Sequence, residues 1–210
     1  MTPATASPRR YVQRVRAEAA ESTARRIADA FLALLMDEWF DEITLDRIAA
    51  KAGVTVQTVV RRFGGKDGLL ADSVQTLATQ INTRRASPPG DVGRMVENLL
   101  ADYEETGDAI VRLLALEPRH AALKAALGFG RSEHRRWVSD VFAEPLETLD
   151  AAARRRALDA LVVATDVYTW KLLRRDMGHS VGATAATLVR LVHATLAEFA
   201  DSDHTRKERR

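Results

Sequence analysis

The sequence predicts an all-α fold, in which a small N-terminal set of three helices is followed by a larger helical domain. Leucine, alanine and arginine dominate the 210 residues, and aromatic residues make up only 6%. Apolar residues recur at the three- and four-residue spacing of a helix face, and the six prolines are confined to a few places. The apolar fraction of 46% is enough for a chain of this length to bury a sizeable core.

The composition excludes several classes of protein. The chain has no cysteine, so neither a disulfide framework nor a cysteine-based zinc site is expected. None of the five histidines forms an i, i+4 pair with another ligand in a convincing metal geometry, and we predict no metal and no cofactor. The N-terminus lacks the apolar core of a signal peptide, and no apolar run approaches the roughly 20 residues needed to cross a bilayer. We therefore expect a soluble, cytoplasmic protein with no membrane partner.

The first 17 residues predict a flexible basic arm, because Pro, Ser, Thr and Arg are mixed there without helical periodicity. Its basic character comes from four arginines that precede the first acid of the chain: Arg9, Arg10, Arg14 and Arg16. Two interpretations stay open, a frayed chain end or an arm that reaches phosphates or a minor groove. A first helix follows from about Glu18 to Trp39, with one apolar stripe along its length.

Two short helices joined by a tight turn come next. Thr44 is a suitable N-cap for a helix that ends at Gly53, where a chain leaving a helix through positive φ favours glycine. Thr55 then caps a second short helix that ends at Phe63. Ala49 is small enough to let the two helices approach each other closely. This pattern predicts a helix-turn-helix in a domain over residues 18–66.

The second helix of this pair has an outer face suited to a DNA major groove. Glutamine pairs with an adenine edge, threonine and valine contact a base or a thymine methyl, and arginine pairs with guanine or neutralises phosphate. The residues on this face are Thr55, Val56, Gln57, Thr58 and Arg61, with Arg62 beside them. The net charge of +2 is too small to indicate nucleic-acid binding, but Arg61, Arg62 and Lys66 form a local basic cluster.

Beyond this domain the sequence predicts a helical domain over residues 67–200. We expect a fourth helix from about 67 to 85, a linker at Ser87-Pro88-Pro89-Gly90, and breaks at Gly107, Pro118, Gly128, Gly130 and Gly178. The expected helices between these breaks cover residues 91–106, 108–116, 119–127, 131–150, 154–176 and 181–199. Residues 201–210, DSDHTRKERR, are expected to form a disordered tail.

Residues 20–70 resemble the DNA-binding domain of the TetR family of one-component repressors. The matching positions are Thr44, Ile48, Ala49, Ala52-Gly53-Val54, Thr55, Thr58, Phe63, Lys66 and Leu69-Leu70. The resemblance implies that Thr44, Thr55 and Lys66 hold phosphates and that Gln57, Thr58 and Arg61 lie nearest the bases. The chain departs from the family pattern at Val60 and Arg62, where tyrosines are frequent, at Gly64-Gly65, where Pro-Ser is frequent, and at Trp39, where glycine is usual.

A single helix-turn-helix buries too little surface to select one site in a genome, so we expect a homodimer on a near-palindromic operator. The two C-terminal helices, 154–176 and 181–199, are apolar around more than one face, which indicates burial both in the core and against a partner. The residues that make these faces are Leu158, Leu161, Val162, Thr165, Val167, Leu172, Leu173, Leu188, Val189, Leu191, Val192, Leu196 and Phe199.

The family resemblance also implies a small-molecule effector of unknown identity, bound in the domain after the linker. The aromatic residues and the central histidine available to line such a pocket are Tyr103, Phe129, His134, Trp137, Phe142, Tyr168 and Trp170. For each of them, packing in the core is the alternative interpretation. The domain is thus predicted to be regulatory, ligand-binding and dimerising, and the protein to be a ligand-responsive repressor.

Two alternatives from other classes remain open at this point. One is a helical protein-interaction adaptor that keeps the helix-turn-helix as a scaffold. The other is a small helical enzyme, but the chain shows no serine elbow, no paired acids in a recognisable setting and no redox cysteine. The GFGR segment at 128–131 follows no predicted strand, so it does not indicate a phosphate-binding loop.

Overall fold

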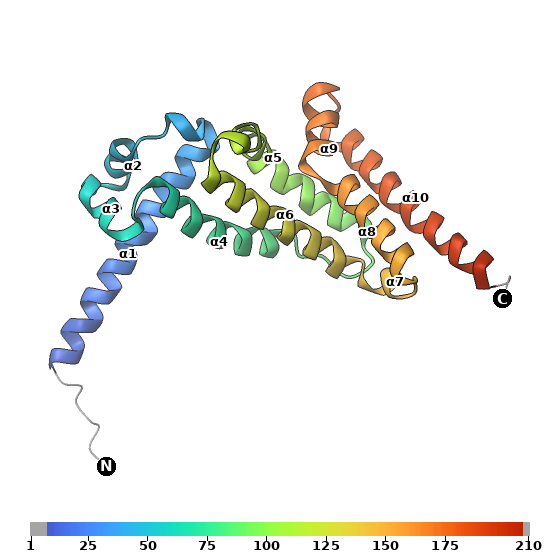
Figure 1. Cartoon of the computed structure of the whole chain (residues 1–210), viewed down its shortest axis with the longest axis horizontal. Helices are drawn as coiled ribbons and strands as arrows, with labels where there is room; N and C mark the ends of the chain where they lie inside the picture. The colour runs from blue at the N-terminus through green and yellow to red at the C-terminus, as the bar shows by residue number, and fades with distance from the viewer. Residues whose placement is uncertain (1–7, 208–210) are drawn as a thin grey trace, which may run out of the picture. The chain divides into compact units, whose positions relative to one another are not determined.

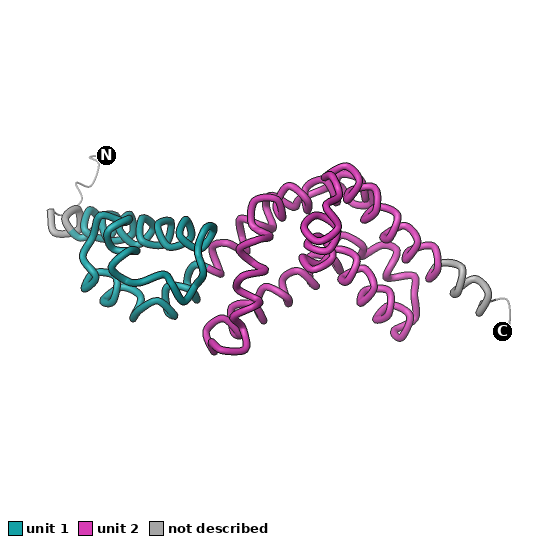
Figure 2. The backbone as a smooth tube through the Cα atoms, turned by 90° about the horizontal axis from the view of Figure 1, so that it is seen from above, with its two compact units in different colours: residues 1–73 teal, residues 74–210 magenta. Residues whose placement is uncertain are grey.

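The computed structural model describes residues 8–207, which form helices and no strand. The all-α prediction is therefore confirmed over this range. The chain divides into two compact units, Met1–Ser73 and Val74–Arg210 (Figure 2). The division lies inside the fourth helix instead of before it at residue 67, because the first turns of that helix supply the buried residues Leu69, Leu70 and Ser73 to the first unit.

The first unit is built from four helices and one short turn. They are α1 (Pro8–Asp37), the 3₁₀ turn η1 (Phe40–Glu42), α2 (Leu45–Ala52), α3 (Val56–Phe63) and the start of α4 (Lys66–Arg84) (Figure 1). The α2 helix packs against both α1 and α3. The fully buried side chains of this unit include Ile27, Phe31, Phe40, Ile43, Ile48, Val59 and Leu69.

The start of α1 corrects the prediction of a flexible arm over residues 1–17. The helix begins at Pro8, so residues 8–17 continue the predicted first helix toward the N-terminus. Proline is favourable at the first helical position because its missing N–H would have no partner there. Residues 9–17 contain no glycine and no further proline, so nothing interrupts the helix. Residues 1–7 of the predicted arm lie outside the described residues.

The second unit contains the rest of α4 and the helices that follow. They are α5 (Val92–Leu116), η2 (Glu117–Arg119), α6 (Ala121–Val141), α7 (Ala143–Glu147), α8 (Ala151–Thr165), α9 (Val167–Lys171), the π-helical turn η3 (Leu172–Asp176) and α10 (Val181–Lys207). The α10 helix packs against α8 and α5, and α5 also packs against α9 (Figure 1). One apolar core joins these helices, with Met95, Leu99, Leu161, Trp170 and Val192 among its fully buried members.

Several predicted breaks in this unit are wrong. The α5 helix passes unbroken through Gly107, and α6 passes through Gly128 and Gly130, because an isolated glycine only weakens a helix that packing holds. The predicted helix 131–150 instead ends at Val141. The predicted helix 154–176 is interrupted at Asp166, whose carboxylate accepts a hydrogen bond from Tyr168 N at 2.8 Å and so starts α9.

The end of α10 also differs from the prediction. The helix continues to Lys207, so most of the segment expected to be a disordered tail is helical. No glycine or proline occurs between Ala183 and Lys207 to stop the helix. Residues 208–210 lie outside the described residues.

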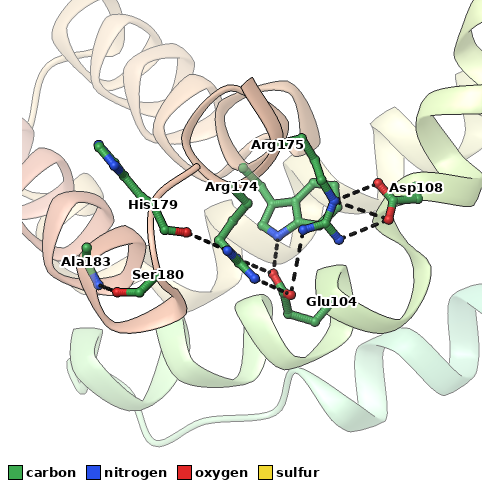
Figure 3. A network of polar contacts seen from close by, with 8 residues as sticks. Glu104, Asp108, Arg174, Arg175, His179, Ser180 and Ala183 are labelled. Carbon is green, nitrogen blue, oxygen red and sulfur yellow. Dashed lines mark hydrogen bonds and ion pairs between the residues drawn. The ribbon is translucent and has the colours of Figure 1, made fainter. Parts of the chain in front are cut away.

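A network of ion pairs fastens α9 and η3 to α5 (Figure 3). The guanidinium of Arg174 donates to both carboxylate oxygens of Glu104 at 2.7 and 2.8 Å, and Trp170 Nε1 donates to the same carboxylate at 2.8 Å. Arg175 donates to both oxygens of Asp108 and lies 4.5 Å from the centre of the Trp170 ring. These bonds hold Trp170 in one position against α5, since both its indole nitrogen and its ring face are engaged.

Candidate nucleic-acid interface

Local hydrogen bonds define the ends of the two helices of the helix-turn-helix. Thr44 Oγ1 accepts from Arg47 N at 3.3 Å at the start of α2, and Thr55 Oγ1 accepts from Thr58 N at 3.2 Å at the start of α3. Gly53, with φ of 64°, ends α2, and Gly64, with φ of 75°, ends α3. Both values lie in the left-handed region that glycine adopts without strain. The predicted caps and the predicted turn are all present.

Buried side chains set the orientation of α3. Val59 is fully buried, and Ala49 of α2 is 3% exposed where the two helices pack. Successive residues turn by about 100° around a helix, so the residues two positions before and after Val59 lie on roughly the opposite side. Gln57 and Arg61 occupy these two positions, and both are exposed. The prediction that α3 presents these two side chains outward is confirmed.

The other predicted contact residues differ in how accessible they are. Arg62, Thr44 and Thr55 are exposed, whereas Val56 and Thr58 are half-buried. The hydroxyl groups of Thr55 and Thr58 lie 3.0 Å apart and share a hydrogen bond. The Thr58 hydroxyl is thus partly engaged at the start of α3, which reduces its hydrogen-bonding capacity for a base edge.

Lys66 makes contacts within the protein that the sequence did not predict. Its Nζ donates to the carbonyl oxygens of Phe40 at 2.7 Å and of Ile43 at 2.9 Å, and it lies 4.3 Å from the centre of the Phe40 ring. Desolvation by burial lowers the pKa of Lys66, while Asp41 and Asp67 act in the opposite direction. Lys66 therefore closes the η1 turn, and phosphate binding by this residue stays a prediction. One signal was available, because a cation at a helix N-terminus is unfavourable without a specific partner.

One exposed residue of α3 was not among the predicted contacts. Val60 is 42% exposed, one turn after Val56 and Gln57. From the sequence it stood out only as a position where the family frequently has a tyrosine. Its exposure follows from the same rotation about Val59 that exposes Arg61.

Three of the predicted effector residues meet around a buried arginine in the second unit. The Arg85 guanidinium lies 4.8 Å from the Tyr103 ring centre and 5.5 Å from that of Trp137, and its Nη1 is 3.3 Å from His134 Nδ1. Its Nε donates to Asp102 at 2.8 Å. We call Arg85, Asp102, Tyr103, His134 and Trp137 the Arg85 cluster.

The charges in the Arg85 cluster shift the titration of its neighbours. Desolvation, together with the positive charge of Arg85, lowers the pKa of His134 to about 3. Burial raises the pKa of Tyr103 to about 12, and Arg85 opposes this shift. Both side chains are therefore neutral near pH 7. Tyr103 also donates to Thr165 O at 3.0 Å, and His134 Nε2 lies 3.1 Å from Thr165 Oγ1, which connects the cluster to α8.

The remaining effector candidates lie apart from this cluster or only at its edge. Tyr168 is 55% exposed, so it does not line a buried pocket, and Phe129 is half-buried on α6. Phe142 and Trp170 are buried members of the apolar core, and Trp170 contacts Tyr103 with ring centres 5.8 Å apart.

Two members of the Arg85 cluster were not predicted from the sequence, namely Arg85 itself and Asp102. The doubled arginine at the end of the fourth helix was the one available signal, and such a pair is more often solvated.

Metal-binding and membrane-spanning features are both missing from the described part of the chain. No group of three or more histidine, aspartate or glutamate side chains there is arranged to hold a metal ion. None of the helices in the same range is both long enough and apolar enough to cross a bilayer.

Comparison with known proteins shows which family the helix-turn-helix resembles. The sequence model described as "Bacterial regulatory proteins, tetR family" matches residues 23–72, which contain the whole helix-turn-helix. Residues 23–72 are thus similar to the DNA-binding domain of the TetR family. TetR-family members are DNA-binding regulators and not enzymes, so this similarity favours a DNA-binding regulator over the enzyme alternative.

Relatives of this chain include two regulators named BetI. The HTH-type transcriptional regulator BetI of Escherichia coli O127:H6 is 26% identical over 144 residues, which cover 66% of this chain and 65% of the relative. The match thus spans slightly less than two thirds of that regulator. BetI of Klebsiella pneumoniae is 26% identical over 172 residues, which cover 79% of this chain and 77% of the relative.

Solved structures share the fold of this chain. A tetR-family transcriptional regulator from Streptomyces coelicolor matches with a TM-score of 0.70 and 18% identity, covering 90% of this chain and 85% of that one. NalD, the secondary repressor of the MexAB-OprM multidrug efflux pump in Pseudomonas aeruginosa, matches with a TM-score of 0.52 and 20% identity, covering 85% and 97%. At these identities the likeness concerns the fold alone.

Proposed function

We propose that this protein is a sequence-specific DNA-binding transcriptional regulator that represses its target by occupying a near-palindromic operator as a homodimer. The observation that carries the proposal is the outer face of α3, where Gln57 and Arg61 are exposed on the side opposite the fully buried Val59. A DNA partner implies that the protein acts in the bacterial cytoplasm. The structurally similar protein NalD is a repressor, which favours repression over activation.

The exposed side chains of α3 divide into two kinds of contact. Gln57 and Arg61 point away from the core and suit adenine and guanine edges in the major groove. Arg62 supplies a positive charge that suits a phosphate of the DNA backbone. The Thr44 hydroxyl accepts a hydrogen bond from Arg47 N, which leaves its own proton to donate to a phosphate oxygen.

The dimer surface belongs on α8 and α10, but on fewer residues than the sequence indicated. Leu161, Leu188 and Val192 are at most 1% exposed within one chain, so they have no surface left for a partner. Val163, at 65% exposed, and Leu191, at 42% exposed, remain accessible on the same two helices. We therefore place the partner against the exposed apolar residues of α8 and α10.

The Arg85 cluster is the candidate site for an effector. Tyr103, His134 and Trp137 gather around Arg85, and this cluster joins the end of α4 to α6 and α8. A small molecule that displaces one of these contacts would change how the end of α4 is held.

Selection of bound fragments from random double-stranded DNA tests the proposed function. Purified protein should enrich a near-palindromic sequence, and its affinity for that sequence should fall steeply as salt rises, because phosphate neutralisation releases counterions. Arg61→Ala and Gln57→Ala should each reduce discrimination between the selected and a scrambled sequence by about 1–3 kcal/mol. Lys51→Ala, which removes an exposed charge from the end of α2, is the matched control. Equal binding to selected and scrambled DNA by the unaltered protein would exclude the proposal.

A further inference from the structure

Val60 is an exposed apolar side chain on an otherwise polar and basic surface. It is 42% exposed, and the exposed residues near it in the sequence of α3 are Gln57, Arg61 and Arg62. Val56, half-buried, lies one turn before it on the same side of the helix. The two valines thus form a short apolar strip along the flank of α3, between the buried Val59 and the outward side that bears Gln57 and Arg61.

Valine at position 60 does little to stabilise the free protein. A β-branched residue has a lower helix propensity than alanine or lysine, by about half a kcal/mol, because the preceding turn restricts its χ1 angle. Val60 is not part of either core, since only Val59 of α3 is buried. Its side chain also carries no donor for a phosphate, so it adds nothing to backbone binding.

The edge of a base pair offers one apolar group in the major groove, the C5-methyl group of thymine. Val56 and Val60 are four residues apart, which corresponds to about 6 Å along the helix axis. Neighbouring bases of one strand are about 3.4 Å apart along the duplex axis, so the strip spans roughly two base steps. The size and chemistry of the strip therefore match one or two thymine methyls.

We propose that Val60, supported by Val56, reads a thymine methyl group in each half-site and so helps to set operator specificity. The proposal rests on the proposed DNA-binding function and adds a specificity-determining residue to it. Gln57 and Arg61, on the outward side next to this strip, would read hydrogen-bonding edges, whereas Val60 would read the presence of a methyl group.

Deoxyuridine provides a direct test, because it lacks only the C5-methyl group of thymidine and keeps every hydrogen-bonding atom. In the selected operator, each thymidine is replaced singly by deoxyuridine, and the affinity is measured by fluorescence anisotropy for the unaltered protein and for Val60→Ala. At one or more positions in each half-site, the replacement should weaken binding of the unaltered protein by about fourfold per buried methyl. The same replacement should leave the affinity of Val60→Ala unchanged.

Two controls separate methyl reading from a general loss of binding. Gln57→Ala should bind more weakly but should keep the thymidine preference at the positions that Val60 reads. Val60→Ala should unfold at the same temperature as the unaltered protein or slightly above it, because Val60 lies outside the core and alanine is the better helix former.

The outcomes distinguish the inference from the function on which it rests. If the unaltered protein prefers the selected operator but thymidine replacement affects it and Val60→Ala equally, methyl reading by Val60 is wrong and the proposed function stands. If the unaltered protein shows no preference for the selected operator, the proposed function is wrong and the inference fails with it.

Discussion

The indole ring of Trp170 lies directly against the backbone of Gly107. A Cβ atom added to residue 107 would come within 2.5, 2.6 and 2.9 Å of three carbons of that ring. Trp170 cannot easily move aside, since its Nε1 is bonded to Glu104 and the Arg175 guanidinium lies over its ring. Gly107 is thus required for the close approach of α9 to α5, and it does not end a helix.

Gly107→Ala should destabilise the protein. Alanine favours the helix by up to about 1 kcal/mol over glycine, but overpacking against a fixed ring costs about 1–3 kcal/mol and should dominate. The free energy of unfolding, measured by urea titration, should fall. Gly130→Ala is the matched control, because Gly130 is also inside a helix and a Cβ added there would have no neighbour within 4 Å. This control should be neutral or more stable than the unaltered protein, and equal effects of the two changes would contradict the packing argument.

Asp102→Asn should be strongly destabilising. The Asp102 side chain is fully buried and pairs with both Arg84 and Arg85, so the neutral amide would leave the buried Arg85 without a counter-charge. Removing one partner of a buried ion pair costs about 3–5 kcal/mol. Urea titration measures the loss. Glu97→Gln breaks the pair with Arg94, in which both side chains are more than half exposed, and should change stability by less than about 1 kcal/mol.

Lys66→Met should weaken the first unit even without DNA. Methionine keeps an apolar stem against Phe40 but cannot donate to the carbonyl oxygens of Phe40 and Ile43. Phe40 O keeps its bond from Ile43 N, and the loss of the two bonds from Lys66 should cost about 1–3 kcal/mol. Amide hydrogen exchange over residues 23–72 should become faster. Arg62→Met removes an exposed charge nearby, and it should leave exchange unchanged while lowering DNA affinity. Unchanged exchange in Lys66→Met would show that the two bonds do not stabilise the unit.

Stability should decrease on acidification partly through His134. Its pKa is about 3 in the folded chain and about 6.5 when unfolded, so the unfolded state binds the proton first as the pH falls. The contribution is fully present above pH 6.5 and is lost between about pH 6.5 and 3, with a slope of about 1.4 kcal/mol per pH unit. Urea titrations across this range should show a shallower slope for His134→Gln. Parallel pH profiles for the two proteins would mean that the pKa of His134 is not lowered in the folded protein.

Much of the helix-turn-helix was determined by the sequence alone. Its boundaries depend on side chains that bond to the backbone within three residues, as Thr44 and Thr55 do, and on glycines that adopt positive φ. The outward direction of Gln57 and Arg61 follows from helical rotation about the apolar Val59. Such features are local, so the order of residues is sufficient to specify them.

The tertiary structure decided the features whose partners lie far along the chain. Lys66 bonds to residues more than 20 positions away, and Trp170 reaches Glu104 over 66 positions. Gly107 looked like a helix break because the ring that needs its space belongs to another helix. A local pattern shows that a residue is charged, small or apolar, but not which distant group folding brings against it, and that contact determines its role.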